Sequence, residues 1–196
     1  HTGSTPAGQQ IIRDSADWVT DLILELGGNA PYIVMEDADI DRAVEAAIPT
    51  RFYNNGQVCT CNERMYLHEK IYDEFMHKFL KRVGTLTVGD QFSGASMGPK
   101  VNKPELEHVE SLVQAAVAAG AKVEIGGGRP SGKSPNGGSF EKGYWFSPTV
   151  LTNVEQAMAV VQDEIFGPVV PIMKIKSFDE ALSYALPMSG RRAVPR

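Results

Sequence analysis

Cys59 is the residue of this chain best suited to act as a nucleophile. It follows the segment Asn54-Asn55-Gly56 and precedes a strand expected at residues 64–68. Because Asn and Gly tolerate positive φ, the backbone can bend sharply there and present the sulfur at the tip of a loop. A thiolate in that place could attack an electrophilic carbon. The alternative is that Cys59 is a small buried apolar residue, as many free cysteines are.

Glu25 is the second residue that could take part in chemistry. It lies between Leu24 and Leu26 and is followed by two glycines. We expect burial beside the two leucines to raise the pKa of Glu25, which would make it a better proton acceptor near neutral pH. A thiol and such a carboxylate would form a catalytic pair.

Alternating helices and strands are expected to position these two residues. Apolar runs predict strands at 22–26, 31–35, 64–68, 122–125, 144–151 and 169–175. Apolar spacing predicts helices at 6–19, 39–52, 70–83, 104–119 and 178–185, with a short helical turn at 155–159. This order of elements predicts an α/β fold, a three-layer αβα arrangement around a mostly parallel sheet.

Two further stretches raise the question of phosphate binding. Gly3 and Ser4 come just before the first expected helix, where backbone amides and a hydroxyl could face a phosphate; a simple N-cap is the alternative. The glycine-rich stretch 126–143 lacks the spacing and the following helix of a phosphate-binding loop. We interpret it as a flexible surface hairpin or excursion.

The composition excludes several classes of protein. Among 196 residues, 42% are apolar and 22% charged, as in an ordinary globular domain, and the net charge of −5 argues against nucleic-acid or acidic membrane partners. No apolar run reaches the roughly 18 to 20 residues of a membrane helix, and no targeting signal is recognisable. Cys59 and Cys61 suit neither a disulfide with each other nor a four-ligand zinc site, which indicates a reducing, cytoplasmic setting.

Three motifs point to one family. LELGG at 24–28, NGQVC at 55–59 and EIFGP at 164–168 resemble, in the same order, signature motifs of the NAD(P)-dependent aldehyde dehydrogenase superfamily. The 34 positions between Glu25 and Cys59 also match that family. Within it, GQVCTCNER is most similar to lactaldehyde and glycolaldehyde dehydrogenases. The resemblance extends from about Thr2 to about Ala185.

The resemblance implies the catalytic-domain portion of such an enzyme, truncated at both ends. Residues 1–22 would be the end of the nucleotide-binding region, 23–186 the catalytic domain, and 187–196 a divergent tail. The sequence does not begin with Met, so we expect it to start inside a longer gene product. The implied partners are a small aldehyde and NAD, with NADP not excluded, and full-length relatives are expected to form homo-oligomers.

The resemblance also implies roles for individual residues. Cys59 would attack the aldehyde to give a thiohemiacetal and then a thioester, and Glu25 would activate the water that hydrolyses the thioester. Glu164 would hold the nicotinamide ribose and Phe166 the ring. The residues expected to contact the cofactor are Gly3, Ser4, Leu26, Glu164 and Phe166. No metal is expected.

Several alternatives stay open. The chain could be a non-catalytic remnant of such an enzyme, or Cys59 and Glu25 could hydrolyse activated esters without a cofactor. Cys61 could protect Cys59 by reversible oxidation or could simply pack in the interior. A metal site formed by the two cysteines and His68 is the weakest of these interpretations.

Overall fold

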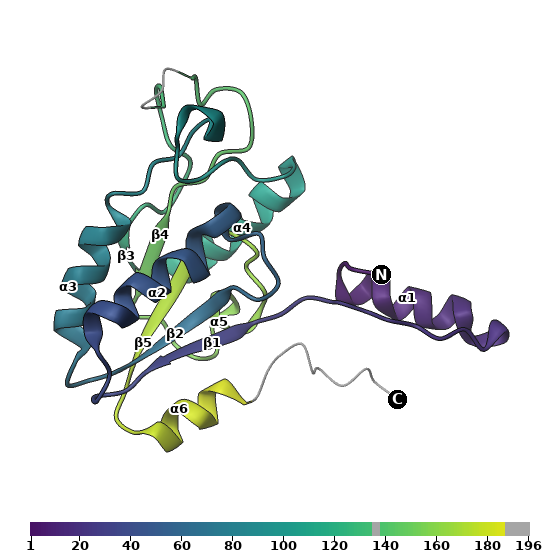
Figure 1. Ribbon diagram of the computed structural model, residues 1–196, viewed down its shortest axis with the longest axis horizontal. Coiled ribbons are helices and arrows are strands. Elements are labelled where there is room, and N and C mark those ends of the chain that lie inside the picture. Colours follow the sequence, from purple (N-terminus) through teal and green to yellow (C-terminus); the bar gives the residue numbers. More distant parts are fainter. Residues whose placement is uncertain (135–137, 187–196) are drawn as a thin grey trace.

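A twisted sheet lies at the centre of the structure, a computed structural model that describes residues 1–134 and 138–186. Within these residues the sheet has five strands in the order β1-β2-β5-β4-β3 (Figure 1). The strands are β1 Ala30–Val34, β2 Asn62–His68, β3 Lys122–Ile125, β4 Thr149–Thr152 and β5 Val169–Ile175. Only the β3–β4 pair among these is antiparallel, which confirms the mostly parallel sheet. The tail expected at 187–196 lies outside the described residues.

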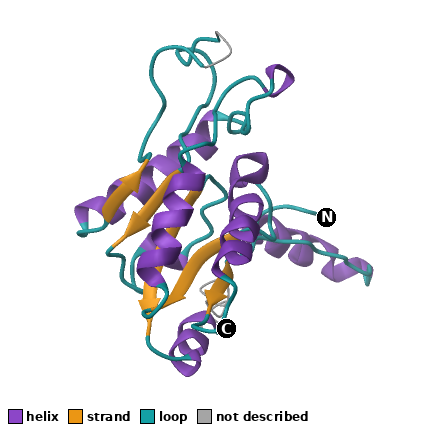
Figure 2. Cartoon of the chain, turned by 60° about the vertical axis from the view of Figure 1, so that its left-hand side comes forward, coloured by secondary structure: helices purple, strands orange, loops and turns teal. Residues whose placement is uncertain are grey.

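Helices cover both faces of the sheet (Figure 2), so the predicted three layers are present. The α-helices are α1 Thr5–Ser15, α2 Ile40–Phe52, α3 Tyr72–Val83, α4 Lys103–Ala118, α5 Ala159–Gln162 and α6 Phe178–Ala185. On β2, Met65 and Leu67 join the apolar cluster under α2 and α3, whereas Tyr66 joins the cluster under α4, α5 and α6. Successive strand residues thus serve opposite faces, and both faces are buried.

Polar side chains fix where the helices begin. Asp39 accepts a hydrogen bond from the Arg42 amide at 3.1 Å, and Asn102 accepts one from the Glu105 amide at 2.9 Å. These N-caps satisfy amides that would otherwise lack a partner in the first turn. α2 continues through Pro49 to Phe52 and delivers the chain to the cysteine loop.

Two expected strands differ from the structure. Residues 22–26 form no strand and make only an isolated bridge at Glu25. This segment runs outside the sheet and pairs with the N-terminus instead. The Gly3 amide donates to the Glu25 carbonyl at 3.0 Å. The strand expected at 144–151 begins only at Thr149, since Pro148 has no N–H for the ladder. The helical turn expected at 155–159 lies later, at α5.

The chain before β1 forms an arm that carries α1 and extends from the α/β body (Figure 1). At the base of the arm, Asn29 is buried in the body and donates to the Val161 carbonyl at 3.0 Å. α1 ends at Ser15, before the expected end of that helix, and a 3-10 turn, Ala16–Trp18, follows it. Val19 then adopts φ 50°, and neither Trp18 nor Val19 is covered by the described residues. None of the helices in the described part of the chain is long and apolar enough to cross a membrane.

The glycine-rich excursion contains no helix or named strand in its described residues. Its two limbs meet at a bridge between Lys133 and Ser139, and the Ser134 amide donates to the Gly138 carbonyl at 2.7 Å. This geometry agrees with a surface hairpin and differs from a loop that opens a helix around a phosphate.

Candidate active site

The loop before β2 presents Cys59 to solvent, as the sequence predicts. Three consecutive residues adopt left-handed φ: Asn54 at 51°, Asn55 at 60° and Gly56 at 70°. They reverse the chain after α2, and the Cys61 amide then closes a turn around Cys59 by donating to the Val58 carbonyl at 3.0 Å. The alternative of a buried Cys59 is therefore wrong.

Cys61 occupies a different environment from Cys59. It is buried, and burial raises the pKa of its thiol above the ordinary value. A protonated thiol is a poor nucleophile, so this burial favours the packing role for Cys61. His68 is the last residue of β2, and that strand begins three residues after Cys59. A strand of this length spans about 20 Å, so His68 lies too far from the two cysteines to bind a metal ion with them. The metal interpretation is therefore wrong.

Backbone contacts bring the Glu25 segment to the cysteine loop. A Cβ at Gly28 would clash with the Cys59 carbonyl oxygen, so only glycine allows this approach. The Gly28 amide also donates to Glu164 Oε1 at 3.0 Å. Glu25 itself is exposed, so the predicted burial beside Leu24 and Leu26 is wrong: the arm that carries it packs through backbone pairing and leaves the carboxylate in solvent.

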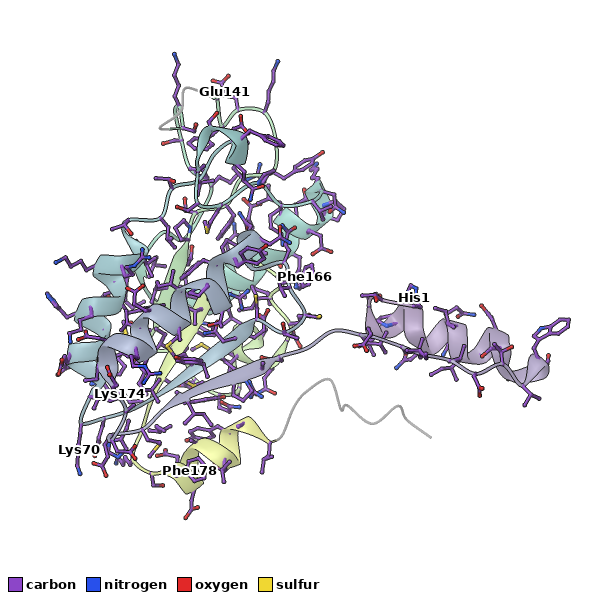
Figure 3. All side chains as sticks on the ribbon, in the orientation of Figure 1. His1, Lys70, Glu141, Phe166, Lys174 and Phe178 are labelled. Atoms are coloured by element: carbon purple, nitrogen blue, oxygen red, sulfur yellow. The ribbon has the colours of Figure 1, made fainter. Side chains whose placement is uncertain are left out.

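Glu164 is half-buried between the arm and α4. Burial raises its pKa above the ordinary value, although the hydrogen bond from Gly28 acts in the opposite sense. Its backbone carbonyl lies 3.0 Å from Nε2 of His108 on α4. The segment that follows leads to Phe166, which lies on the edge of the body that faces the arm (Figure 3).

A cleft of about 620 Å³ joins these segments. All seven residues that the sequence singles out line it: Gly3, Ser4, Glu25, Leu26, Cys59, Glu164 and Phe166. They come from the start of the arm, from its return segment, from the cysteine loop and from the turn before β5. Residues separated by up to 163 positions, from Gly3 to Phe166, are therefore brought to one place.

Some residues of the site were missed by the sequence reasoning. Glu105 and His108 of α4 also line the cleft. Arg51, Glu63 and Lys100 are buried and contact the turn at 165–167 that carries Phe166. A signal existed for the first two of the buried group, since Arg51 interrupts the apolar end of α2 and Glu63 stands at the entry to an apolar strand. A charge at such a position is uncommon unless it is paired.

Comparison with known proteins gives this cleft its context. The model of the aldehyde dehydrogenase family matches residues 1–185. The chain belongs to the aldehyde dehydrogenase family. This match confirms the resemblance carried by the three motifs.

Individual members of the aldehyde dehydrogenase family agree with this assignment. The 3,6-anhydro-alpha-L-galactose dehydrogenase of Vibrio sp. (strain EJY3) is 52% identical over 185 residues, which are 94% of this chain and 38% of that protein. The lactaldehyde dehydrogenase of Escherichia coli (strain K12) is 40% identical over 186 residues, or 94% of this chain and 37% of that protein. The chain thus spans less than two fifths of these relatives.

A solved structure confirms the fold of this family member. The structure of a 3,6-anhydro-L-galactose dehydrogenase in complex with NAP superposes with a TM-score of 0.91 at 55% identity, covering 95% of this chain and 38% of that one. The fold predicted from the motifs, the catalytic-domain type of this family, is therefore present.

Proposed function

We propose that this chain is the catalytic portion of an enzyme that oxidises a small aldehyde to a carboxylic acid with NAD(P)+. One observation carries the proposal: Cys59, Glu25 and the five candidate cofactor residues line a single cleft. On this proposal residues 1–22 belong to the nucleotide-binding region and 23–186 to the catalytic domain. A nucleophilic thiol also needs a reducing compartment, for which we propose the cytoplasm.

The chemistry of the cleft fits a nicotinamide dinucleotide. Ser4 caps α1, so its hydroxyl and the amides of the first turn can face a pyrophosphate. The Glu164 carboxylate can accept hydrogen bonds from ribose hydroxyls, and the Phe166 ring can pack on a flat heterocycle. When bound, the cofactor would supply the hydride acceptor that turns a thiohemiacetal on Cys59 into a thioester.

The residues of the chain would carry the remaining steps. The Cys59 thiolate would attack the aldehyde carbon, because sulfur is a strong nucleophile and its thioester is readily hydrolysed. Glu25 would take a proton from the water that attacks the thioester carbonyl, which releases the acid and restores Cys59. The exposure of Glu25 leaves it accessible to that water.

Replacing Glu25 by glutamine tests this assignment. We expect the steady-state hydrolysis of p-nitrophenyl acetate by the purified chain to fall by about 100-fold, because a general base contributes 10²- to 10⁴-fold. The first turnover should persist as a burst of p-nitrophenol, and mass spectrometry should find the acetyl group on Cys59. Asp21→Asn, at an exposed position on the same arm, is the matched control and should behave as wild type.

Assays of the purified wild-type chain distinguish a dehydrogenase from an esterase and from a non-catalytic remnant. NADH formed from glycolaldehyde and NAD+ would support the dehydrogenase. Ester hydrolysis without NADH would mean that this chain is an esterase alone, and the absence of both would mean a non-catalytic remnant. Loss of the burst together with the steady state in Glu25→Gln would contradict a role for Glu25 in hydrolysis.

A further inference from the structure

Phe166 has an unusual backbone conformation for a bulky residue. Its φ is 49°, in the left-handed region that residues with a Cβ seldom enter. Unlike the two asparagines of the cysteine loop, it has no polar side chain to stabilise this conformation locally. Such conformations persist only where the surrounding structure over-determines them.

Buried charged side chains surround the turn that contains Phe166. Oε2 of Glu63 accepts a hydrogen bond from the Ile165 amide at 2.9 Å, and Oε1 accepts one from the Phe166 amide at 3.3 Å. Nζ of Lys100 donates to the Phe166 carbonyl, and Nη2 of Arg51 donates to the carbonyl of Gly167. Four consecutive peptide groups of the turn are thus held by three charged side chains.

These three side chains come from different elements and are themselves fixed. Arg51 lies in the last turn of α2, Glu63 is the second residue of β2, and Lys100 precedes α4. Each has at most 2% of its surface exposed. Arg51 and Glu63 form an ion pair at 3.1 Å, and the Lys100 amide donates to the Tyr144 carbonyl at 2.7 Å.

Burying the Lys100 ammonium costs free energy, so its contact with the Phe166 carbonyl must offset that cost. Burial lowers its pKa to about 8, and the positive charge of Arg51 acts in the same direction. The ammonium also lies 5.4 Å from the centre of the Phe166 ring, close enough for a cation–π interaction. Lys100 therefore contacts both the backbone and the ring of the same residue.

We propose that Arg51, Glu63 and Lys100 form a buried charged clamp that holds Phe166 in its left-handed conformation and so fixes its ring at the edge of the cleft. The three are positioning residues, since they act through Phe166. The functional consequence rests on the proposed function: the ring would be presented to the nicotinamide without a reorganisation step on binding. The clamp itself can be tested without the cofactor.

Amide hydrogen exchange of the purified chain measures the clamp directly. In Glu63→Gln we expect the Ile165 and Phe166 amides to exchange at least about ten times faster than in wild type, whereas amides in the middle of β5 change by less than about threefold. Lys100→Met, which keeps Arg51 and Glu63 paired, should accelerate the same two amides. Lys103→Met, an exposed lysine three residues away, is the control and should leave them unchanged.

A glycine variant at position 166 tests whether the clamp acts on the left-handed conformation. Glycine adopts positive φ without a steric penalty, so Phe166→Gly should make the clamp largely dispensable. In that variant Lys100→Met, which leaves the Glu63 acceptor in place, should accelerate the Ile165 amide and the amide at position 166 by less than about threefold. Full acceleration there, or unchanged exchange of the two amides in both clamp variants, or equal acceleration throughout β5, would overturn the proposal.

A titration with NADH connects the clamp to the proposed function. We expect Lys100→Met to raise the Kd for NADH by about five- to tenfold, and Lys103→Met to leave it unchanged. If NADH binds the wild type and Lys100→Met equally, the clamp does not position the ring for the cofactor. If the wild type binds no NADH, the proposed function fails, whereas the exchange data still decide whether the clamp exists.

Discussion

Replacing Cys59 by alanine should lower both the hydrolysis of p-nitrophenyl acetate and any NADH formation by this chain by at least about 1,000-fold. The size of the expected loss follows from the role of Cys59 as the covalent nucleophile, whose removal leaves only binding and electrostatic effects. Stopped-flow absorbance should also detect no burst of p-nitrophenol. Because Cys59 is exposed on a loop, the substitution should change the free energy of unfolding very little.

Cys61→Ala is the matched control for Cys59→Ala. It removes a buried thiol two residues away, so we expect a modest loss of stability and ester hydrolysis within a few-fold of wild type. Iodoacetamide should label Cys59 readily and Cys61 slowly in the folded chain. Retained hydrolysis in Cys59→Ala, or its disappearance only in Cys61→Ala, would show that the nucleophile is assigned to the wrong residue.

Replacing Arg51 by methionine should destabilise the chain by about 3–5 kcal/mol, because the variant leaves the carboxylate of Glu63 buried without its partner. The two side chains are at most 2% exposed, and Nη1 of Arg51 lies 3.1 Å from Oε1 of Glu63. The variant also removes the donor to the Asn62 carbonyl at 2.9 Å. Urea unfolding followed by far-UV circular dichroism measures the change.

Arg82→Met provides the comparison for Arg51→Met. Arg82 forms an ion pair with Glu45 at 3.0 Å, but both side chains are more than two fifths exposed. Solvent screening limits such a pair to about 0–1 kcal/mol. If the two arginine variants lose similar stability, burial of the Arg51–Glu63 pair does not determine its contribution, and the account of the clamp loses its energetic basis.

The sequence predicted the features that depend on local patterns. Apolar spacing located α2 and β2, and the residues Asn54-Asn55-Gly56 predicted the sharp reversal that exposes Cys59, which their left-handed φ values confirm. The three motifs identified the family because each lies within five consecutive residues and because they follow one another in the family's order. Each of these inferences depends on residues close together in the sequence.

Features that depend on distant residues could not be predicted in this way. Glu63 contacts the Phe166 amide across 103 positions, and nothing near either residue indicates that contact. The prediction that Glu25 is buried was wrong because burial also depends on distant residues. Neighbouring leucines do not bury a carboxylate when the segment lies on an arm outside the sheet. Likewise, 144–148 is β-prone, but the ladder starts only after Pro148.

We propose that the nucleophile and the cofactor occupy one cleft, which Cys59, Glu164 and Phe166 line. The most direct test measures the rate at which iodoacetamide labels Cys59, by mass spectrometry, with and without saturating NADH. We expect NADH to slow the labelling of Cys59 by at least about fivefold, because a dinucleotide held by Ser4, Glu164 and Phe166 would cover the same space as the sulfur. Binding of NADH with no change in the labelling rate would contradict the claim, as would the absence of binding.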